Sequence, residues 1–596
     1  MLATAPTPRP RPLPAAVAAA GLLLLAALPA LAQAPPAEEP EEVFFESVDV
    51  DLANLEVFVT DADGRPIIGL GKDDFELWVD GERVEIQNFY AASTAVAAPA
   101  AEAAAATTTA EGAAPAAPVA DGGLTMVILL DESNVTPGER QRALKDLADS
   151  FARGLPAGTR AMVATFTTRI EVLVPFTNDG TAIADALVSQ LKRTARGSGR
   201  DLEFRRLLRQ LEDSSNDVEG DPGDVLFAIR SFQSQELSAL QNTLTYLEQL
   251  MRGLSGLPGR KALLYLGGGL DRAPGRSLLE AWRDKYGAAA QVPITDLDLG
   301  LLGAETAPLF ERLIEHANAN RVIFYAISTA GVGPGNAISA EAGGFDPGAL
   351  NTASGGRGWS VARDSSYRAD QSGGLALVAD ETGGRALIGS SQYDLVTEWI
   401  DQDAEHLYSL GFAAPPGEPG SRHDVEVRVP GRDLRLRYRR ALVTTTPEQR
   451  TVDRTIAALF YGDASNPLMV RAELGEVERF RGDLVQPVLV KIPFANLALL
   501  PSSSGYSGEL AIHVVAEDAE GRMSEVRSME APVRLPADRI QEALAGVAGY
   551  RLALAVRPGR QRIAIGVRDV LGDVTSTVLL EENIVAPGRR DRRGGR

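Results

Sequence analysis

The sequence predicts an α/β protein built on a doubly wound, mostly parallel sheet, with a small N-terminal β module before it and a C-terminal β-sandwich after it. Three observations predict this fold class. An uninterrupted apolar run at residues 124–130 ends in Asp131 and Ser133, as a fully buried strand of a parallel sheet does. Strand-like and helix-like segments then alternate as far as residue 412. Short strand-like runs separated by turns follow from residue 452, which is typical of a sandwich.

The N-terminal residues 1–32 have the features of a secretory signal peptide. Arg9 and Arg11 precede an apolar run, residues 15–31, which ends in small residues and is interrupted by Pro29. This run is shorter than the roughly 20 apolar residues that a membrane-spanning helix needs. We therefore expect export to the periplasm or the cell exterior. The alternative is that the segment is retained as an N-terminal membrane anchor.

Three segments of biased composition separate or end the predicted domains. Residues 33–42 are mostly Pro, Ala and Glu and predict a disordered spacer. Residues 91–121 are mostly Ala, Thr, Pro and Glu and predict a linker, while the basic residues 586–596 predict a solvated tail. Between spacer and linker, apolar residues alternate with others over 43–90, which predicts the small β module.

Residues 122–445 form the predicted α/β domain, and residues 452–585 form the predicted sandwich. Two stretches interrupt the α/β pattern at about 195–233 and 330–374. The first is polar and acidic, and the second is rich in Gly, Ser and Asp. Long irregular stretches inside compact domains are often functional, so the second is expected to be a lid or a contact arm.

Composition excludes several classes of function. The formal net charge of −21 opposes binding to nucleic acid and to anionic lipid. The absence of cysteine excludes disulfides, thiolate catalysis and Cys-ligated zinc. The four histidines stand alone, and neither a nucleophile elbow nor a zinc-protease motif occurs. We therefore predict a protein that is not an enzyme.

Several motifs together resemble a known family. Residues 129–133, Leu-Leu-Asp-Glu-Ser, and residues 378–385, Val-Ala-Asp-Glu-Thr-Gly-Gly-Arg, are similar to segments of a von Willebrand factor type A domain. With the β module before them and residues 408–440 after them, the chain resembles the exported bacterial VWFA-related proteins over about residues 43–445. The resemblance implies a Rossmann-like sheet that binds its ligands at the carboxyl edge.

The resemblance also implies a metal-ion-dependent adhesion site. In that site D-x-S-x-S, a Thr and a further Asp hold Mg²⁺ through oxygen ligands. Asp131 and Ser133 match the first two positions, but the third is Val135, and Gly-Gly-Gly at 267–269 stands where the further Asp is expected. No Thr is identified in the expected second loop. We therefore predict no tightly bound cofactor and leave Mg²⁺ open, and favour the alternative that Asp131 and Ser133 cap the next helix or fix the strand-end loop.

The sequence thus predicts an exported, non-enzymatic protein that binds a protein or a cell-surface ligand through loops at the carboxyl edge of the sheet, beside a degenerate metal site. The predicted partner-binding residues lie in the loops after two strands: Glu132, Asn134, Gly267, Gly268, Gly269 and Asp271. Two alternatives remain open. One is an envelope hydrolase whose carboxylates converge in a cleft between domains, and the other is a purely structural envelope component.

Overall fold

The computed structural model describes most of the chain from residue 52 to residue 585. The described residues are 52–92 and 123–585, without 134, 136, 168–169, 194–197, 213–220, 258, 287–295, 330–355, 416, 463, 481–482, 503–504, 540–541 and 543. The predicted signal peptide (1–32), spacer (33–42), nearly all of the linker (91–121) and the basic tail (586–596) lie outside them, as does Asn134. Within the described ranges, no helix is both long enough and apolar enough to cross a membrane.

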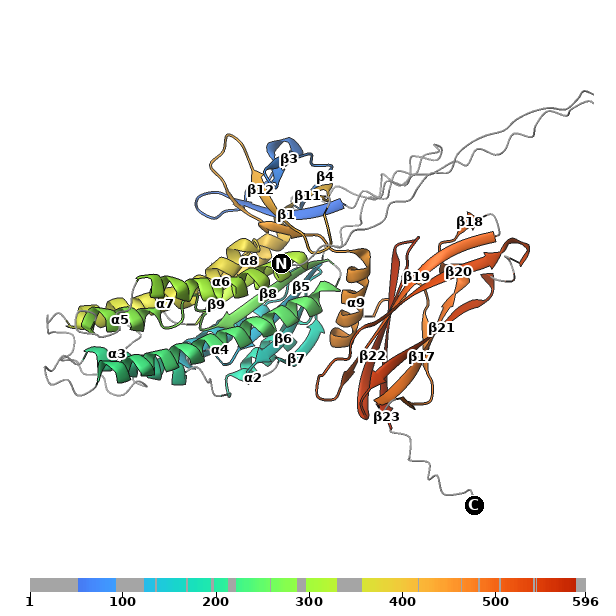
Figure 1. The fold of residues 1–596 in the computed structure, drawn as a ribbon. Coiled ribbons are helices and arrows are strands. Elements are labelled where there is room, and N and C mark those ends of the chain that lie inside the picture. Colours follow the sequence, from blue (N-terminus) through green and yellow to red (C-terminus); the bar gives the residue numbers. More distant parts are fainter. Residues whose placement is uncertain are drawn as a thin grey trace, which may run out of the picture. The chain divides into compact units, whose positions relative to one another are not determined.

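A six-stranded sheet in the order β10-β9-β8-β5-β6-β7 is the centre of the α/β domain (Figure 1). The predicted mixed α/β class is confirmed: β5 pairs in parallel with β6 and β8, whereas β7 runs antiparallel to β6. Every residue of β5 is buried. The strands are β5 (Leu124–Asp131), β6 (Arg160–Phe166), β7 (Ile170–Thr177), β8 (Arg260–Gly267), β9 (Val322–Ser328) and β10 (Ala386–Leu387).

Successive side chains of β5 belong to two different hydrophobic cores. Val127 and Leu129 pack with one set of helices, and Met126 and Ile128 pack with another. Because strand side chains alternate between the two faces, a strand covered on both sides must be apolar throughout. The first set is α4 (Pro222–Ser255), α6 (Asp296–Ala319) and α7 (Gly356–Glu381). The second set is α1 (Pro137–Phe151), α2 (Gly180–Gln190) and α8 (Leu395–Glu405).

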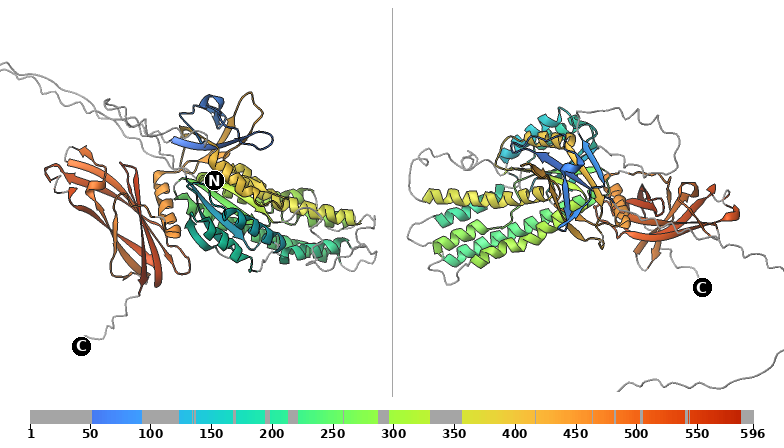
Figure 2. Two further views of the ribbon diagram at one scale, coloured as in Figure 1. Left: turned by 180° about the vertical axis from the view of Figure 1, so that it is seen from behind. Right: turned by 90° about the horizontal axis from the view of Figure 1, so that it is seen from above.

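The longest helices continue past the carboxyl edge of the sheet and form a separate core there (Figure 2). This helical extension consists of α3 (Ser198–Glu212), α5 (Arg276–Tyr286) and the adjoining parts of α4, α6 and α7. Phe204 and Tyr367 stack inside it with ring centroids 3.8 Å apart. The stretch predicted as an insertion at 195–233 is therefore largely helical. Of the second stretch, residues 330–355 lie outside the described ranges and 356–374 belong to α7.

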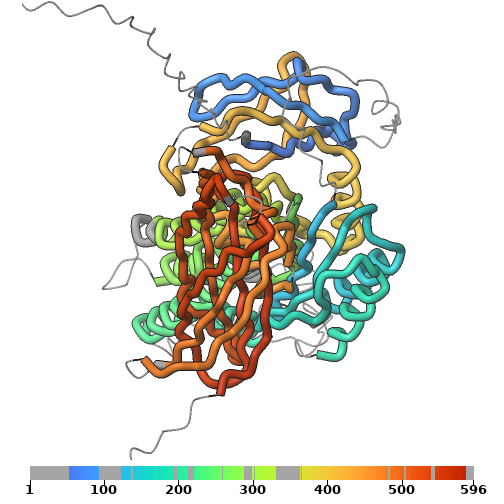
Figure 3. Tube along the Cα trace, turned by 90° about the vertical axis from the view of Figure 1, so that its right-hand side faces the viewer, coloured from blue at the N-terminus to red at the C-terminus, as the bar shows by residue number. Residues whose placement is uncertain are grey.

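Strands from before and after the α/β domain build one β unit together (Figure 3). β1 (Leu52–Thr60) pairs antiparallel with β11 (Leu407–Ala413), and β2 (Glu76–Val79) pairs antiparallel with β12 (Arg422–Arg428). Val57, Leu77 and Phe412 share its core. The strands predicted as an N-terminal module are therefore only half of this unit. The remaining strands are β3 (Glu82–Val84), β4 (Asn88–Ala92), β13 (Arg435–Arg437) and β14 (Ala441–Val443).

The C-terminal part consists of antiparallel strands over a core that includes Val488, Ile512 and Ile565. A helix that the sequence did not predict, α9 (Pro447–Tyr461), precedes these strands, and its first turn is capped by the Thr446 side chain. The strands are β15 (Arg471–Leu474), β16 (Glu478–Phe480), β17 (Asp483–Pro493), β18 (Leu500–Ser502), β19 (Gly505–Asp518), β20 (Arg527–Pro536), β21 (Val547–Val556), β22 (Gly559–Asp569) and β23 (Val574–Ile584).

Candidate functional site

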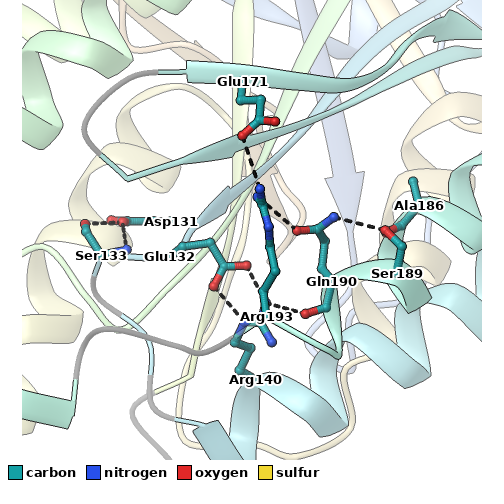
Figure 4. Close-up of polar contacts among 9 residues, drawn as sticks. All are labelled: Asp131, Glu132, Ser133, Arg140, Glu171, Ala186, Ser189, Gln190 and Arg193. Carbon is teal, nitrogen blue, oxygen red and sulfur yellow. Dashed lines mark hydrogen bonds and ion pairs between the residues drawn. The ribbon is translucent and has the colours of Figure 1, made fainter.

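Asp131 ends β5, and its carboxylate is fully buried. Its Oδ1 atom accepts hydrogen bonds from the backbone N–H of Ser133 at 3.1 Å and from the Ser133 hydroxyl at 2.5 Å (Figure 4). Its Oδ2 atom accepts a hydrogen bond from the phenol of Tyr265, on the neighbouring strand β8, at 2.6 Å. Burial raises the pKa of Asp131, and these hydrogen bonds act in the opposite direction. Groups of the protein thus satisfy both carboxylate oxygens.

The phenol of Tyr265 occupies the space that a side chain at Gly267 would need. A Cβ atom at position 267 would lie 2.5 Å from the Tyr265 hydroxyl oxygen and 2.6 Å from a ring carbon. Burial raises the pKa of Tyr265 well above its usual value, so the phenol stays protonated and donates a hydrogen bond to Asp131. Position 267, the first of the three glycines, must therefore be glycine, because any side chain there would overlap Tyr265. Tyr265 is not among the predicted site residues, because its only signal in the sequence is one hydroxyl within an apolar strand.

These contacts do not fit a magnesium ion. Mg²⁺ requires a nearly octahedral set of oxygens at about 2.0–2.1 Å. Val135 is buried and has no side-chain oxygen, residues 267–269 have no side chains, and both Asp131 oxygens already accept hydrogen bonds. Across the ranges that the structure describes, no three His, Asp or Glu side chains are grouped as a metal site would require.

A cation of the protein itself lies close to Asp131. Arg200 of α3 donates from Nε to the Oε1 atom of Glu236, on α4, at 2.6 Å, and its Nη2 atom also bonds this carboxylate. The Glu236 side chain is only 3% exposed. Burial raises the pKa of Asp131 and of Asp271, and the charge of Arg200 lowers both. The stretch predicted as a polar insertion therefore supplies the positive charge at this site.

Glu132 is the acid of a buried ion pair. Its carboxylate accepts from Arg140 of α1, with Nε–Oε2 and Nη2–Oε1 distances of 2.8 and 2.5 Å (Figure 4). The two side chains are 2% (Arg140) and 5% (Glu132) exposed. Arg140 also donates to the backbone carbonyl of Gln190 at 2.8 Å. This arrangement joins the end of β5 to α1 and α2 and leaves no carboxylate oxygen at the surface.

The loop after β8 is also buried, beneath the helical extension. Residues 267–269 and Asp271 are buried, and the Leu270 N–H donates to the backbone carbonyl of Gln371, on α7, at 2.7 Å. The prediction that this edge offers a loop surface is therefore corrected: helices cover it. The predicted partner-binding residues that the structure buries are Glu132, Gly267, Gly268, Gly269 and Asp271.

The buried carboxylates of Asp131, Glu236 and Asp271 have no histidine beside them in the described part of the chain. The histidine contacts lie elsewhere: His316 with Arg252, His423 with Asp80, His513 with Ser528 and His406 with Glu405. A general acid–base pair of the usual carboxylate–imidazole kind is therefore not assembled at this site.

Replacing Gly267 by alanine is expected to destabilise the protein by about 1–3 kcal/mol, because the new methyl group would overlap the enclosed ring of Tyr265. Urea unfolding monitored by tryptophan fluorescence measures the change. Gly300→Ala on α6 is the control, since nothing lies within 4 Å of its new Cβ atom. Equal stability of the two variants would contradict the close approach of Tyr265 to Gly267.

No family model and no curated protein matches the chain. Similar solved structures include an aerotolerance-related membrane protein from Bacteroides fragilis NCTC 9343. Its sequence is 12% identical, the match covers 47% of this chain and 98% of that chain, and the TM-score is 0.21. A manganese-loaded TRAP protein from Plasmodium vivax has 12% identity, 32% and 74% coverage and a TM-score of 0.14. TM-scores this low support no conclusion about function. A further similar structure is a von Willebrand factor type A protein from Catenulispora acidiphila, of the family that the sequence resembles, with 11% identity, 78% and 66% coverage and a TM-score of 0.19.

Proposed function

We propose that the chain is an exported, non-enzymatic binding protein with a von Willebrand factor A-like, doubly wound domain whose adhesion site has lost its metal ion. The closed site at Asp131 carries this proposal. Ser133 and Tyr265 donate hydrogen bonds to the carboxylate, and the charge of Arg200 also favours its ionised form, so protein groups take the place of a metal ion. A nucleophile or a general base must reach its substrate, and a carboxylate with no exposed surface cannot do so.

The helical extension is the proposed contact surface for a protein or cell-surface ligand. It covers the carboxyl edge of the sheet, where the sequence predicted recognition. Phe227 of α4 is 76% exposed, the largest value among the exposed large apolar side chains of the described residues, and Leu202 of α3 is 56% exposed. A contact with another protein would remove these two side chains from water, which is favourable for apolar groups.

Retention of a partner by the immobilised chain tests this function. A cell-envelope extract is passed over the wild type and over a Leu202→Ser, Phe227→Ser variant. The proposal predicts that a component of the extract binds to the wild type and to Asp131→Asn. The same component should not bind to the Leu202→Ser, Phe227→Ser variant. Leu500→Ser, which changes a 57% exposed side chain of the sandwich, is the matched control and should behave as the wild type does. Equal retention by all variants would contradict the assignment to the extension.

A further inference from the structure

A cavity of about 190 Å³ lies within the helical extension, between α5, α6 and α7. Pockets for small molecules usually have volumes of about 300–1,000 Å³, so this cavity is of a size for a single side chain. Its lining combines two arginines, one carboxylate and small residues: Arg272, Arg276, Gly303, Ala369, Asp370 and Gly373.

Both arginines lie against glycines of neighbouring helices. A Cβ atom at Gly373 would be 3.5 Å from the Arg272 Cδ atom, and one at Gly303 would be 3.4 Å from the Arg276 Nη2 atom. The backbone carbonyl of Arg272 is also held by the Thr306 hydroxyl at 2.5 Å. The absence of side chains at Gly303 and Gly373 therefore leaves room beside the two arginines.

The positive charge of the two arginines is only partly compensated. The Nη1 atom of Arg276 is 3.8 Å from the Oδ1 atom of Asp370, beyond the about 2.7–2.9 Å of a charge-assisted hydrogen bond. Arg272 has no carboxylate within ion-pair distance among the residues that the structure describes. The cavity thus has a local excess of positive charge in a chain whose net charge is −21.

We infer that this arginine pocket, formed by Arg272, Arg276 and the residues around them, binds the carboxylate of an aspartate or glutamate side chain from the partner. The inference deepens the proposed function and rests on it for the partner being a protein. Guanidinium groups bind carboxylates through paired N–H donors, and both arginines line one small cavity. Asp370 in the same cavity repels a doubly charged phosphate more strongly than a singly charged carboxylate, which favours an acidic side chain.

Titration of the full chain with N-acetyl-aspartate methylamide, followed by saturation-transfer NMR, tests the pocket. The asparagine analogue is the neutral control and should bind at least about tenfold more weakly, since charge-assisted hydrogen bonds are about twice as strong as neutral ones. Arg272→Gln and Arg276→Gln should each weaken the binding of the aspartate probe by a similar factor. Arg312→Gln, which changes a 58% exposed arginine of α6 outside the pocket, should leave its binding unchanged.

A second pair of variants keeps both arginines. Gly373→Glu places a carboxylate beside Arg272, and it should abolish probe binding and raise the melting temperature above that of Gly373→Gln. Equal binding of the two probes, or unchanged binding in both arginine variants, would overturn the inference.

The proposed function and the arginine pocket can be disproved independently of each other. Retention of a partner through the extension without binding of the aspartate probe would overturn the pocket and leave the proposed function. Binding of the probe without any partner retained through the extension would overturn the proposed function and leave a carboxylate site.

Discussion

Replacing Arg140 by alanine is expected to destabilise the α/β domain by about 3–5 kcal/mol, because it leaves a buried charge without its partner. The Arg140 and Glu132 side chains are 2% and 5% exposed and are joined by two hydrogen bonds. After the substitution the Glu132 carboxylate would be unpaired at the end of the central strand. Urea unfolding monitored by tryptophan fluorescence measures the loss.

Arg142→Ala is the matched control for this result. Arg142 lies on the same helix and pairs with Glu139 at 3.0 Å, but its side chain is 53% exposed. Glu139 is only 10% exposed, but it keeps a hydrogen bond from the Tyr393 hydroxyl at 2.8 Å, so the loss should stay near the roughly 0–1 kcal/mol of an ion pair with an exposed partner. If the two variants lost similar stability, the Glu132–Arg140 pair would not be the buried connection between β5 and α1 that the structure shows.

The raised pKa of Asp271 is expected to lower the stability of the wild type as the pH rises from about 4 to about 7, and Asp271→Asn is expected to remove this contribution. Burial raises the pKa of Asp271 to about 7 from its ordinary value of 3.8. The charges of Asp370 and Glu236 add to the rise, while a backbone hydrogen bond from Ala273 and the charge of Arg200 oppose it. In this pH window the native state keeps a proton that the unfolded state has lost, so a higher pH favours unfolding. At about 1.4 kcal/mol per pKa unit, the effect has an upper limit of about 4 kcal/mol.

Unfolding free energies of wild type and Asp271→Asn at pH 5 and pH 8 measure this effect. The amide resembles the protonated acid, so the variant should gain stability relative to the wild type at pH 8. Burial lowers the pKa of Lys261 to about 7. This shift makes the stability rise with pH, but only above about pH 7, and it is present in both proteins. Asp224→Asn, at an exposed position of α4, is the control. Parallel pH profiles for wild type and Asp271→Asn would contradict the burial of Asp271.

Local sequence signals were sufficient for the central sheet and its first helix. Helix α1 and strand β6 begin and end where the pattern of residues indicates. Their signals are short-range, namely Pro137 at the first helical position and apolar residues at the spacing of a helix or of a strand. The buried strand that ends at Asp131 is likewise visible from its uninterrupted apolar run.

Long-range contacts explain what the sequence did not predict. Phe204, Leu207 and Leu211 have helical spacing in α3, but charged neighbours dominate the composition there. The first half of α7 is rich in Gly and Ser, and its helix packs into the extension through Tyr367. The pairing of β1 with β11 joins residues more than 300 positions apart. Alternation along a strand identifies its buried face but not its partner strand.

The candidate site was predictable in position but not in composition. Asp131 and Ser133 stand at the strand end as expected, and the loss of oxygen ligands at Val135 and residues 267–269 was visible in the sequence. What replaces those ligands was not visible. Tyr265 precedes Gly267 by two positions and therefore shares its face of β8, and only the packed structure brings its hydroxyl to Asp131.

Calorimetric titration with Mg²⁺, Mn²⁺ and Ca²⁺ tests most directly whether Asp131 is held by the protein instead of by a metal ion. The full chain is compared with Asp131→Ala and with the isosteric Asp131→Asn, each verified as folded by circular dichroism. The closed site formed by Ser133 and Tyr265 predicts that none of the three ions binds in a way that depends on Asp131. Saturable binding of any of them to the wild type that disappears in both variants would contradict it.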